Sequence, residues 1–335
     1  MAETYKKLVA TQWSSDFRTA AEVVKAPIPE PGPHEVVVRN RYAGVNATDV
    51  NITAGRYTPG AELPIDLGAE ASGRVVAVGT DVKHVQVGDA VVTSTLGGGY
   101  REYHCVRANN TFKVSTPSPE ALSIMVSGLT ASIALQEVGN LKSGETVLVT
   151  AAAGGTGQYA VQLASRAGNR VIGTCGTDEK VDLLNELGCD RPINYRSEDV
   201  AAVLADECPD GVDLVYEGVG GELFDTCVDA LAVHGRLLCI GYVSEYVEGP
   251  KPVTRPRIYT KLLSKSASIH GFFLPQFTMY FGEHLRHLME LLHRDDLHVA
   301  IDERDFHGIE SVPDAVEYLH SGQSRGKVVV QFDDG

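Results

Sequence analysis

The stretch that decides the fold is Thr146-Val147-Leu148-Val149-Thr150-Ala151-Ala152-Ala153-Gly154-Gly155-Thr156-Gly157. Its first part is an apolar run of strand length, and its second part is a turn of small residues. Ala160, Leu163, Ala164 and Ala167 then recur at the spacing of one helix face. A turn between a strand and a helix aims backbone N–H groups and the positive helix end at a bound anion, and missing Cβ atoms allow close approach. The sequence therefore predicts a phosphate-binding turn.

Strand and helix patterns alternate after this turn. Apolar runs predict further strands at 170–174, 212–216, 236–240 and 268–270. A helix is predicted from about Asp178 to Leu187, where Gly188 ends it. This alternation is typical of a doubly wound parallel sheet that helices cover on both faces, the Rossmann arrangement. In that setting, the glycine turn favours dinucleotide binding over a merely structural turn.

The remainder of the chain is β-rich. Short apolar runs broken by glycine and proline lie at 35–39, 73–79, 90–93 and 103–106. The character changes near Pro119, and the tail is predicted to contain helices over 281–292 and from near Pro313, with a last strand at 327–331. We therefore expect an α/β protein with two domains, a β-rich domain over 1–122 and 274–335 and a Rossmann domain over 123–273.

Composition limits the class of protein. The 335 residues are 43% hydrophobic and 22% charged, which is ordinary for a globular chain of two domains. The net charge of −15 disfavours binding to nucleic acid. Six cysteines without a C-x-x-C pair favour a reducing compartment. With no signal-like segment, no apolar run of about 18 residues and no Ser-Lys-Leu ending, we expect a cytoplasmic protein that does not bind a membrane.

The end of the second Rossmann strand bears on which dinucleotide binds. NAD sites usually place an acidic residue there for the ribose hydroxyls, whereas this strand ends Gly173-Thr174-Cys175-Gly176. Lys180 in the next helix offers an ammonium to a 2'-phosphate, and Tyr195 offers a hydroxyl. These features predict NADPH rather than NADH. The alternative for Lys180 is a solvated lysine that pairs with Asp178 or Glu179.

Together, these segments resemble the medium-chain dehydrogenase/reductase superfamily, and within it the zinc-free branch of quinone oxidoreductases and prostaglandin reductases. The glycine signature is Ala151-x-x-Gly154-x-x-Gly157, and further similar segments lie at 126–131, 174–180, 189–195 and 265–274. The resemblance covers nearly the whole chain. It implies that the β-rich domain is a GroES-like catalytic domain and that the protein is a homodimer.

The same superfamily raises the question of zinc. Zinc-dependent relatives carry a Gly-His-Glu segment, but the corresponding segment here is Gly68-Ala69-Glu70. Without that imidazole we expect no catalytic metal. His284 and His287, three residues apart with His293 nearby, are expected to lie on a solvated helix face.

The resemblance also implies roles for single residues. Asn46 and Asp49 match an Asn-x-x-Asp motif whose Asn lies near the nicotinamide ribose and the substrate. Coenzyme contacts are implied for Asn46, Thr130, Ala151, Gly154, Gly155, Thr156, Gly157, Gly176, Lys180, Tyr195, Gly218, Val219, Ile240, Tyr246, Phe272, Phe273 and Leu274. On spacing alone, Asn46 and Asp49 could equally cap a turn, and the two Phe residues could be core.

A nicotinamide site without zinc suits the reduction of an activated alkene. Hydride transfer to the β-carbon moves negative charge to the carbonyl oxygen, where hydrogen-bond donors stabilise an enolate. The candidate catalytic residues are Asn46, Tyr57 and Tyr246, with Tyr242 as an alternative. A role as cleft wall or core aromatic is equally open for each tyrosine. Asn51 stands where quinone oxidoreductases usually carry Tyr, so their substrate contacts do not transfer directly.

Three functions remain open from the sequence. The first is NADPH-dependent reduction of α,β-unsaturated ketones, with enones like 15-oxo-prostaglandins as the class that the resemblance implies. The second is reduction of quinones, and the third is a crystallin-like protein that binds NADPH without turnover. A mobile loop over 242–259 and apolar residues at 272–280 are expected to line the substrate entrance, which favours an apolar enone or quinone.

Overall fold

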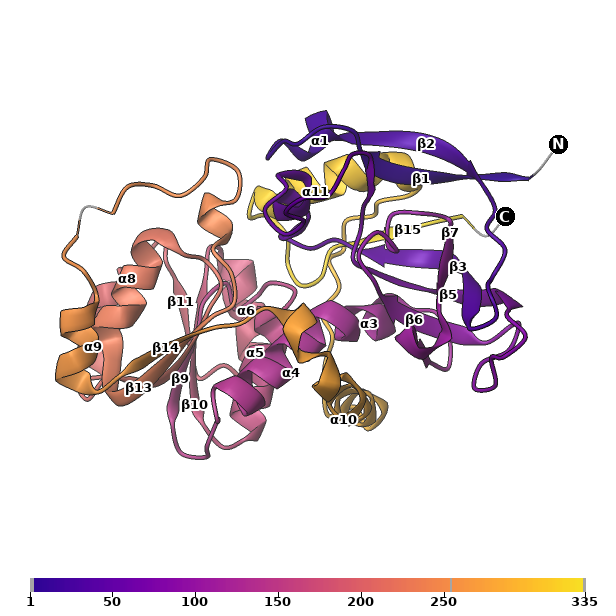
Figure 1. Cartoon of the computed structure of the whole chain (residues 1–335). Helices are drawn as coiled ribbons and strands as arrows, with labels where there is room; N and C mark the ends of the chain where they lie inside the picture. Colours follow the sequence, from indigo (N-terminus) through magenta and orange to yellow (C-terminus); the bar gives the residue numbers. More distant parts are fainter. Residues whose placement is uncertain (1–2, 254, 334–335) are drawn as a thin grey trace. The chain divides into compact units, whose positions relative to one another are not determined.

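The computed structural model describes residues 3–253 and 255–333, which form two compact units (Figure 1). Unit 1 contains Met1–Val126 and Ala300–Gly335, and unit 2 contains Ser127–Val299. These units differ from the expected domains at residues 123–126, which belong to unit 1, and at residues 274–299, which pack in unit 2. The reason is helix α10 (Phe281–His293), which packs on α4 (Leu129–Ile133). The assignment of a function to each domain stays a prediction.

Unit 1 is built from antiparallel strands. Its larger sheet has the order β15-β3-β5-β6-β8, with β7 also paired to β3. The strands of this sheet are β3 (Glu35–Gly44), β5 (Glu70–Val78), β6 (Ala90–Ser94), β7 (Tyr103–Arg107), β8 (Thr111–Lys113) and β15 (Val329–Gln331). Alternate side chains of β3, such as Val36 and Val38, enter a buried cluster with Val75 and Val91. β15 returns the end of the chain to β3.

A second sheet of unit 1 was not predicted from the sequence. It has the order β2-β1-β4, with β1 (Thr4–Ala10), β2 (Ala21–Pro27) and β4 (Ile65–Asp66). The helices of unit 1 are α1 (Phe17–Ala20), α2 (Asp49–Thr53), α3 (Pro119–Ser123) and α11 (Val312–His320). Helix α2 begins at Asp49, three residues after Asn46, and the Asp49 carboxylate accepts from Asn46 N.

Unit 2 contains the predicted parallel sheet, which confirms the predicted fold class. The order is β11-β10-β9-β12-β13-β14, and every neighbouring pair is parallel. The strands are β9 (Thr146–Val149), β10 (Arg170–Cys175), β11 (Arg191–Asn194), β12 (Val212–Glu217), β13 (Leu231–Cys239) and β14 (Ser268–Gly271). The chain order reverses between β9 and β12, the place where doubly wound sheets bind dinucleotides.

Helices cover both faces of this sheet, as the contacts of β10 illustrate. Successive residues of this strand point to opposite faces of the sheet. Ile172 lies in a buried cluster with residues of helices α7 (Val200–Glu207) and α8 (Gly221–Ala230). The next residue, Gly173, faces Leu184 of the opposite layer. The other helices of unit 2 are α5 (Gly157–Arg166), α6 (Asp178–Glu186) and α9 (Tyr259–Lys265).

The helical run Pro119–Val138 corrects one expectation from composition. It combines α3, α4 and two π-helical turns, η2 (Ile124–Gly128) and η3 (Ala134–Val138). This run has 20 residues and a mean hydropathy of 1.4, so it is long and apolar enough to cross a membrane, contrary to the expectation. However, 78% of its most apolar window is buried inside the protein, as in a core helix. Its apolar composition is thus explained by packing.

His284 corrects another expectation. Its side chain is buried, whereas His287 and His293 are exposed. The Ser132 hydroxyl lies 2.8 Å from His284 Nδ1, and Glu137 Oε1 lies 3.3 Å from its Nε2. The imidazole therefore ties α10 to the α4 region. Among residues 3–253 and 255–333, no group of three or more His, Cys, Asp or Glu side chains is arranged to hold a metal ion.

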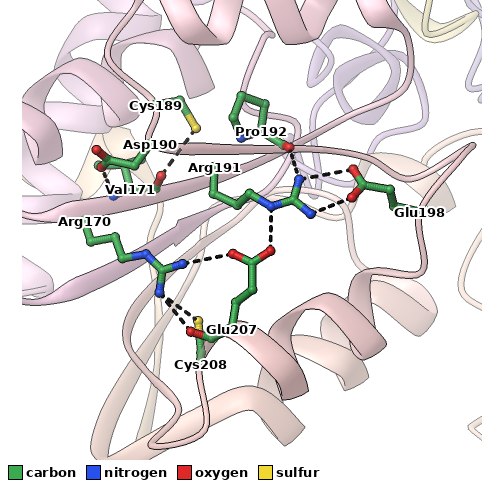
Figure 2. Close-up of polar contacts among 9 residues, drawn as sticks. All are labelled: Arg170, Val171, Cys189, Asp190, Arg191, Pro192, Glu198, Glu207 and Cys208. Atoms are coloured by element: carbon green, nitrogen blue, oxygen red, sulfur yellow. Dashed lines mark hydrogen bonds and ion pairs between the residues drawn. The ribbon is translucent and has the colours of Figure 1, made fainter.

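A network of ion pairs joins β10, β11 and α7 (Figure 2). Glu207 contacts Arg191 at 2.7 Å and Arg170 at 3.0 Å, and Arg191 also contacts Glu198 at 2.5 Å. Arg170 and Arg191 are the first residues of their strands, so the network lies at the amino edge of the sheet. The charges are partly exposed, and their role is structural.

Candidate functional site

The predicted coenzyme residues of unit 2 gather at one edge of the sheet. Parallel strands end at the same edge, and the expected residues follow those ends. Ala151 to Gly157 follow β9, Gly176 follows β10, Tyr195 follows β11, Gly218 and Val219 follow β12, Ile240 follows β13, and Phe272 to Leu274 follow β14. Thr130 lies on α4 and is 8% exposed. The structure thus brings most of the predicted set to the carboxyl edge.

The turn after β9 is too tight for any side chain at its last glycine. A Cβ at Gly157 would lie 2.4 Å from Ala151 O and 2.7 Å from Ala152 O. Ala151 itself has a φ of 46°, and its carbonyl accepts from Gly154 N at 2.9 Å. The backbone therefore folds back on itself directly before α5, which is the geometry that a pyrophosphate needs for close approach.

Thr156 leaves the first turn of α5 without a side-chain cap. Its Oγ1 instead donates to Ser127 O at 3.1 Å and lies 2.6 Å from the Tyr216 hydroxyl. The first N–H groups of a helix have no partner within the helix, and the helix dipole makes this end positive. Because Thr156 does not cap the helix, the first backbone N–H groups of α5 can donate to a bound anion.

The end of β10 holds the residues expected to select the coenzyme. The Tyr195 hydroxyl lies against Gly176, since a Cβ at that glycine would be 2.5 Å from it, and Tyr195 is 52% exposed. Lys180 is the third residue of α6, which the Thr177 side chain caps. Asn194 Nδ2 donates to Asp178 Oδ1 at 2.7 Å, so this carboxylate already has a partner in the structure.

Glu217 is a functional candidate that the sequence reasoning missed. It ends β12, is 1% exposed, and its Oε1 accepts from Val219 N at 2.7 Å and Gly220 N at 2.9 Å. Thr150, which directly follows β9, donates to the same oxygen at 3.3 Å. Burial raises the pKa of the Glu217 carboxyl. The Glu217 side chain holds the loop that contains Gly218 and Val219 through these hydrogen bonds. In the sequence, Glu217 could have been recognised as an acidic residue at the end of an otherwise apolar strand.

The two predicted tyrosines belong to different units. Tyr246 in unit 2 is 2% exposed, and its ring meets the Tyr242 ring edge-on at 4.6 Å between centroids. Its hydroxyl accepts from Tyr242 N at 3.4 Å and lies next to Gly241, directly after Ile240. Tyr57 in unit 1 is half-buried and follows α2.

The segments expected to line the substrate entrance are only partly regular. Residues 243–245 form a short 3₁₀ turn in the loop over 242–259, and Thr254 lies outside the described residues. Phe272 stacks on Phe277 at 4.7 Å between centroids, whereas Phe273 is 39% exposed. Aromatic side chains therefore pack on each other directly after β14.

Asn46 lies in a buried polar network of unit 1. Its Nδ2 donates to Glu70 Oε1 at 3.0 Å, and its Oδ1 accepts from Lys327 Nζ at 2.8 Å. Lys327 Nζ also contacts Glu70 Oε1 at 2.6 Å. Glu70 Oε2 accepts from Val126 N at 2.9 Å. Glu70 and Lys327 thus bind the Asn46 amide, and Glu70 also binds the backbone at Val126.

Asp49 extends this network. Its Oδ2 accepts from the Tyr100 hydroxyl at 2.5 Å and from Asn46 N at 2.9 Å. Its Oδ1 is buried and has no hydrogen-bond partner among the described residues. Burial raises the pKa of Asp49 to about 6, although the hydrogen bond from Tyr100 opposes this. The Asn46-x-x-Asp49 motif therefore does cap a turn, and it also fixes the backbone that carries Asn46.

Asp49→Asn is expected to remove a pH dependence of stability between pH 4 and 6. The pKa of about 6 in the folded protein exceeds the unfolded value of about 3.9, so the folded state binds more protons in this window. The wild type therefore loses about 2 kcal/mol of stability from this group as the pH rises from 4 to 6. Urea unfolding of both proteins across this range measures the difference, and a difference that does not vary with pH would contradict the assignment.

Glu70, Tyr100 and Lys327 were not singled out from the sequence. In the sequence, Glu70 is only the last residue of Gly68-Ala69-Glu70, the segment in which Ala69 replaces the zinc-binding histidine. Lys327 is there only the first residue of the last predicted strand. The available signal was a charged residue at the head of the apolar run Lys327–Gln331. Their contacts join residues up to 281 positions apart, which periodicity does not reveal.

Comparison with known proteins supports both units. The family model described as "Alcohol dehydrogenase GroES-like domain" matches residues 32–118, and that described as "Zinc-binding dehydrogenase" matches residues 155–293. The chain is 47% identical to prostaglandin reductase-3 of Mus musculus, over 98% of this chain and 90% of that protein. It is 44% identical to a probable quinone oxidoreductase of Leishmania amazonensis, over 98% of both chains.

Two further proteins bear on the chemistry. The chain is 31% identical to an NADP(+)-dependent 2-alkenal reductase of Nicotiana tabacum, over 94% of this chain and 92% of that protein. Among solved structures, the quinone oxidoreductase of Escherichia coli complexed with NADPH matches with a TM-score of 0.86 and 27% identity, over 97% of this chain and 99% of that one. These likenesses extend over whole chains, so they concern both units.

Proposed function

The chain belongs to the medium-chain dehydrogenase/reductase family, in the branch of prostaglandin reductases and quinone oxidoreductases, and from that premise we propose that it reduces the C=C bond of α,β-unsaturated ketones with NADPH. The observation that carries the proposal is the edge of the parallel sheet, where the glycine turn and the residues after five other strands stand together. The likeness to a prostaglandin reductase and an alkenal reductase supports an enone as substrate.

The residues present fit the coenzyme. The turn that admits no Cβ at Gly157 and the uncapped start of α5 suit the pyrophosphate. Gly176, Lys180 and Tyr195 at the end of β10 would hold the 2'-phosphate, and the loop shaped by Glu217 would hold the adenosine side through Gly218 and Val219. When bound, NADPH supplies the hydride.

The remaining chemistry falls to the side chains of the protein. Reduction of an enone places negative charge on its carbonyl oxygen, so a donor must reach that oxygen, and a proton must reach the α-carbon. We propose Tyr57 and Tyr246 as candidates because each carries a phenol. The aromatic residues that follow β14, Phe272 and Phe277 among them, would form the wall along an apolar substrate.

Two alternatives concern the same coenzyme. Quinone reduction is supported by the names of the Leishmania and Escherichia coli relatives. A crystallin-like protein that binds NADPH without turnover would keep the glycine turn and need none of the tyrosines.

The test is to mix the purified protein with NADPH and follow loss of the nicotinamide absorbance with a panel of enones, enals and quinones. We expect the highest kcat/KM with long apolar enones. Faster turnover of quinones would favour the first alternative. Tight NADPH binding without consumption by any acceptor would favour the second. If short polar alkenes reacted as well as long enones, the proposed apolar wall would be wrong.

We also propose a homodimer in the cytosol. β14 is the last strand in the order of the parallel sheet, and an open edge invites pairing with a second copy. Helix α9 beside it exposes Leu263 to 82% and Tyr259 to 63%. The six free thiols suit a reducing compartment. Sedimentation equilibrium at micromolar concentration tests the dimer, and the mass of a single chain would reject it.

A further inference from the structure

His284 belongs to a buried chain of hydrogen bonds in unit 2 that the proposed function does not use. Its Nδ1 lies 2.8 Å from the Ser132 hydroxyl, and its Nε2 lies 3.3 Å from Glu137 Oε1. An ionised carboxylate only accepts hydrogen bonds, so Nε2 is the donor to Glu137. Ser132 is 0% exposed and has no other hydrogen-bond partner among the described residues. Its hydroxyl therefore donates to Nδ1, and both ring nitrogens are occupied.

The π-helical turn η3 brings two residues of one helical run to the same imidazole. Ser132 and Glu137 are five residues apart, and in a regular α-helix such residues point about 140° apart around the axis. In a π-helical turn the hydrogen bonds run between residues five apart, so such residues lie on the same side of the helix. Single turns of this kind are rare and are frequent at functional sites. The irregular turn thus provides the contact with α10.

A row of aromatic rings leads from His284 to the end of β14. The Tyr280 ring meets the imidazole edge-on at 6.2 Å between centroids. The Phe277 ring lies 6.4 Å from that of Tyr280, and the Phe272 ring stacks on Phe277 at 4.7 Å. Phe272 N donates to Cys239 O at 3.1 Å, which fixes this end of the row to the sheet. The aromatic row, Phe272, Phe277 and Tyr280, is therefore held at the sheet by one end and at α4 by the other.

The backbone between these two attachments has little regular structure. It forms η5 (Leu274–Tyr280), a 3₁₀ helix that Phe277 interrupts with a φ of −114° and a ψ of 20°. Phe277 and Tyr280 are half-buried, so their rings are covered only in part. Short 3₁₀ segments with few buried contacts open more easily than regular helices. The hydrogen bonds of His284 supply a constraint that η5 does not supply itself.

We propose that His284 is a positioning residue for the aromatic row, and that its hydrogen bonds to Ser132 and Glu137 make the protein favour long apolar enones over short polar ones. The inference rests on the proposed function, which places the rings after β14 along an apolar substrate. Rings that are ordered before binding spare the substrate the entropic cost of ordering them. A substrate too short to reach these rings gains nothing from their order.

The first test is the ratio of kcat/KM for a long-chain enone over a short enal. Ser132→Ala/His284→Leu makes both partners apolar, so that neither polar group is left buried alone. We expect this double variant to lower the ratio about five- to tenfold, through a higher KM for the long enone, the effect of one lost aromatic contact. His284→Gln keeps an acceptor for Ser132 and a donor for Glu137, so we expect a ratio within about twofold of the wild type.

Hydrogen exchange of the protein without coenzyme tests the positioning directly. Peptides that cover residues 272–284 are expected to exchange faster in the double variant than in the wild type, because the attachment to α4 is lost. Peptides that cover β9 are expected to exchange at the wild-type rate. His287→Leu is the matched control, since His287 is exposed on the same helix, three residues further on. We expect this control to change neither the exchange nor the ratio.

The outcomes separate the proposal from its premise. Unchanged exchange of residues 272–284 in the folded double variant would overturn the positioning role, whatever the activity. Faster exchange with a wild-type ratio would overturn the role in substrate choice, and an equal loss with both substrates would report general loosening and overturn it as well. If the double variant does not fold, Tyr280→Leu removes the ring that His284 contacts, and a wild-type ratio there would overturn the proposal. A wild type that reduces no enone would instead overturn the proposed function.

Discussion

Gly157→Ala is expected to lower the affinity for NADPH by at least about a hundredfold. The added methyl would lie 2.4 Å from Ala151 O and 2.8 Å from Ala152 Cα, and these are backbone atoms that cannot rotate away. The turn must therefore move, and its N–H groups lose their alignment with the pyrophosphate. Hydrogen bonds to a charged group contribute about 1.5–3 kcal/mol each, so the loss of two weakens binding about 10² to 10⁴-fold. Calorimetric titration with NADPH measures the change.

Gly282→Ala is the matched control for this substitution. Its Cβ would meet nothing within 4 Å, and the residue lies in the first turn of α10, where alanine is a good helix former. We expect wild-type affinity for NADPH and no loss of stability in this variant. Circular dichroism shows whether Gly157→Ala is folded when it is titrated. Wild-type affinity in folded Gly157→Ala would exclude this turn as the pyrophosphate site.

The parallel sheet was predictable because each of its strands carries its own signal. Val147, Leu148 and Val149 are fully buried, and strands covered on both faces need apolar residues at every position. Glycines such as Gly188 end the intervening helices at the expected places. The carboxyl edge follows from the parallel order alone, so the coenzyme residues of unit 2 could be proposed without coordinates.

The network around Asn46 could not be predicted in the same way. Lys327 meets Asn46 only because β15 pairs with β3 in a register that sets Val329 opposite Gly44, and nothing local in either segment encodes that register. The burial of His284 depends likewise on α10 packing against α4. In both cases a polar residue has its partner on a distant segment, and periodicity describes only its own element.

The second large effect concerns the preference for NADPH over NADH, which we expect to depend on a single charged residue after β10. Lys180→Glu is expected to lower the ratio of kcat/KM for NADPH over NADH by about 10² to 10³. The substitution removes a charge-assisted hydrogen bond to the 2'-phosphate, about 1.5–3 kcal/mol, and adds repulsion between two negative groups. NADH lacks that phosphate, and a carboxylate at this place can accept from its ribose hydroxyls. Steady-state kinetics with both coenzymes measure the ratio.

Lys142→Glu separates this local effect from the overall charge of the protein. Lys142 is exposed and precedes β9, at the opposite edge of the sheet, and its replacement makes the same change to the net charge of −15. We expect it to change the ratio less than about threefold, because charges further apart than about 10 Å are screened at ordinary ionic strength. The effect of Lys180→Glu should shrink when salt is raised to about 0.5 M, because Lys180 is only partly buried and salt screens its charge. Equal ratios for the two variants would show that Lys180 is a solvated lysine and that the coenzyme preference arises elsewhere in the site.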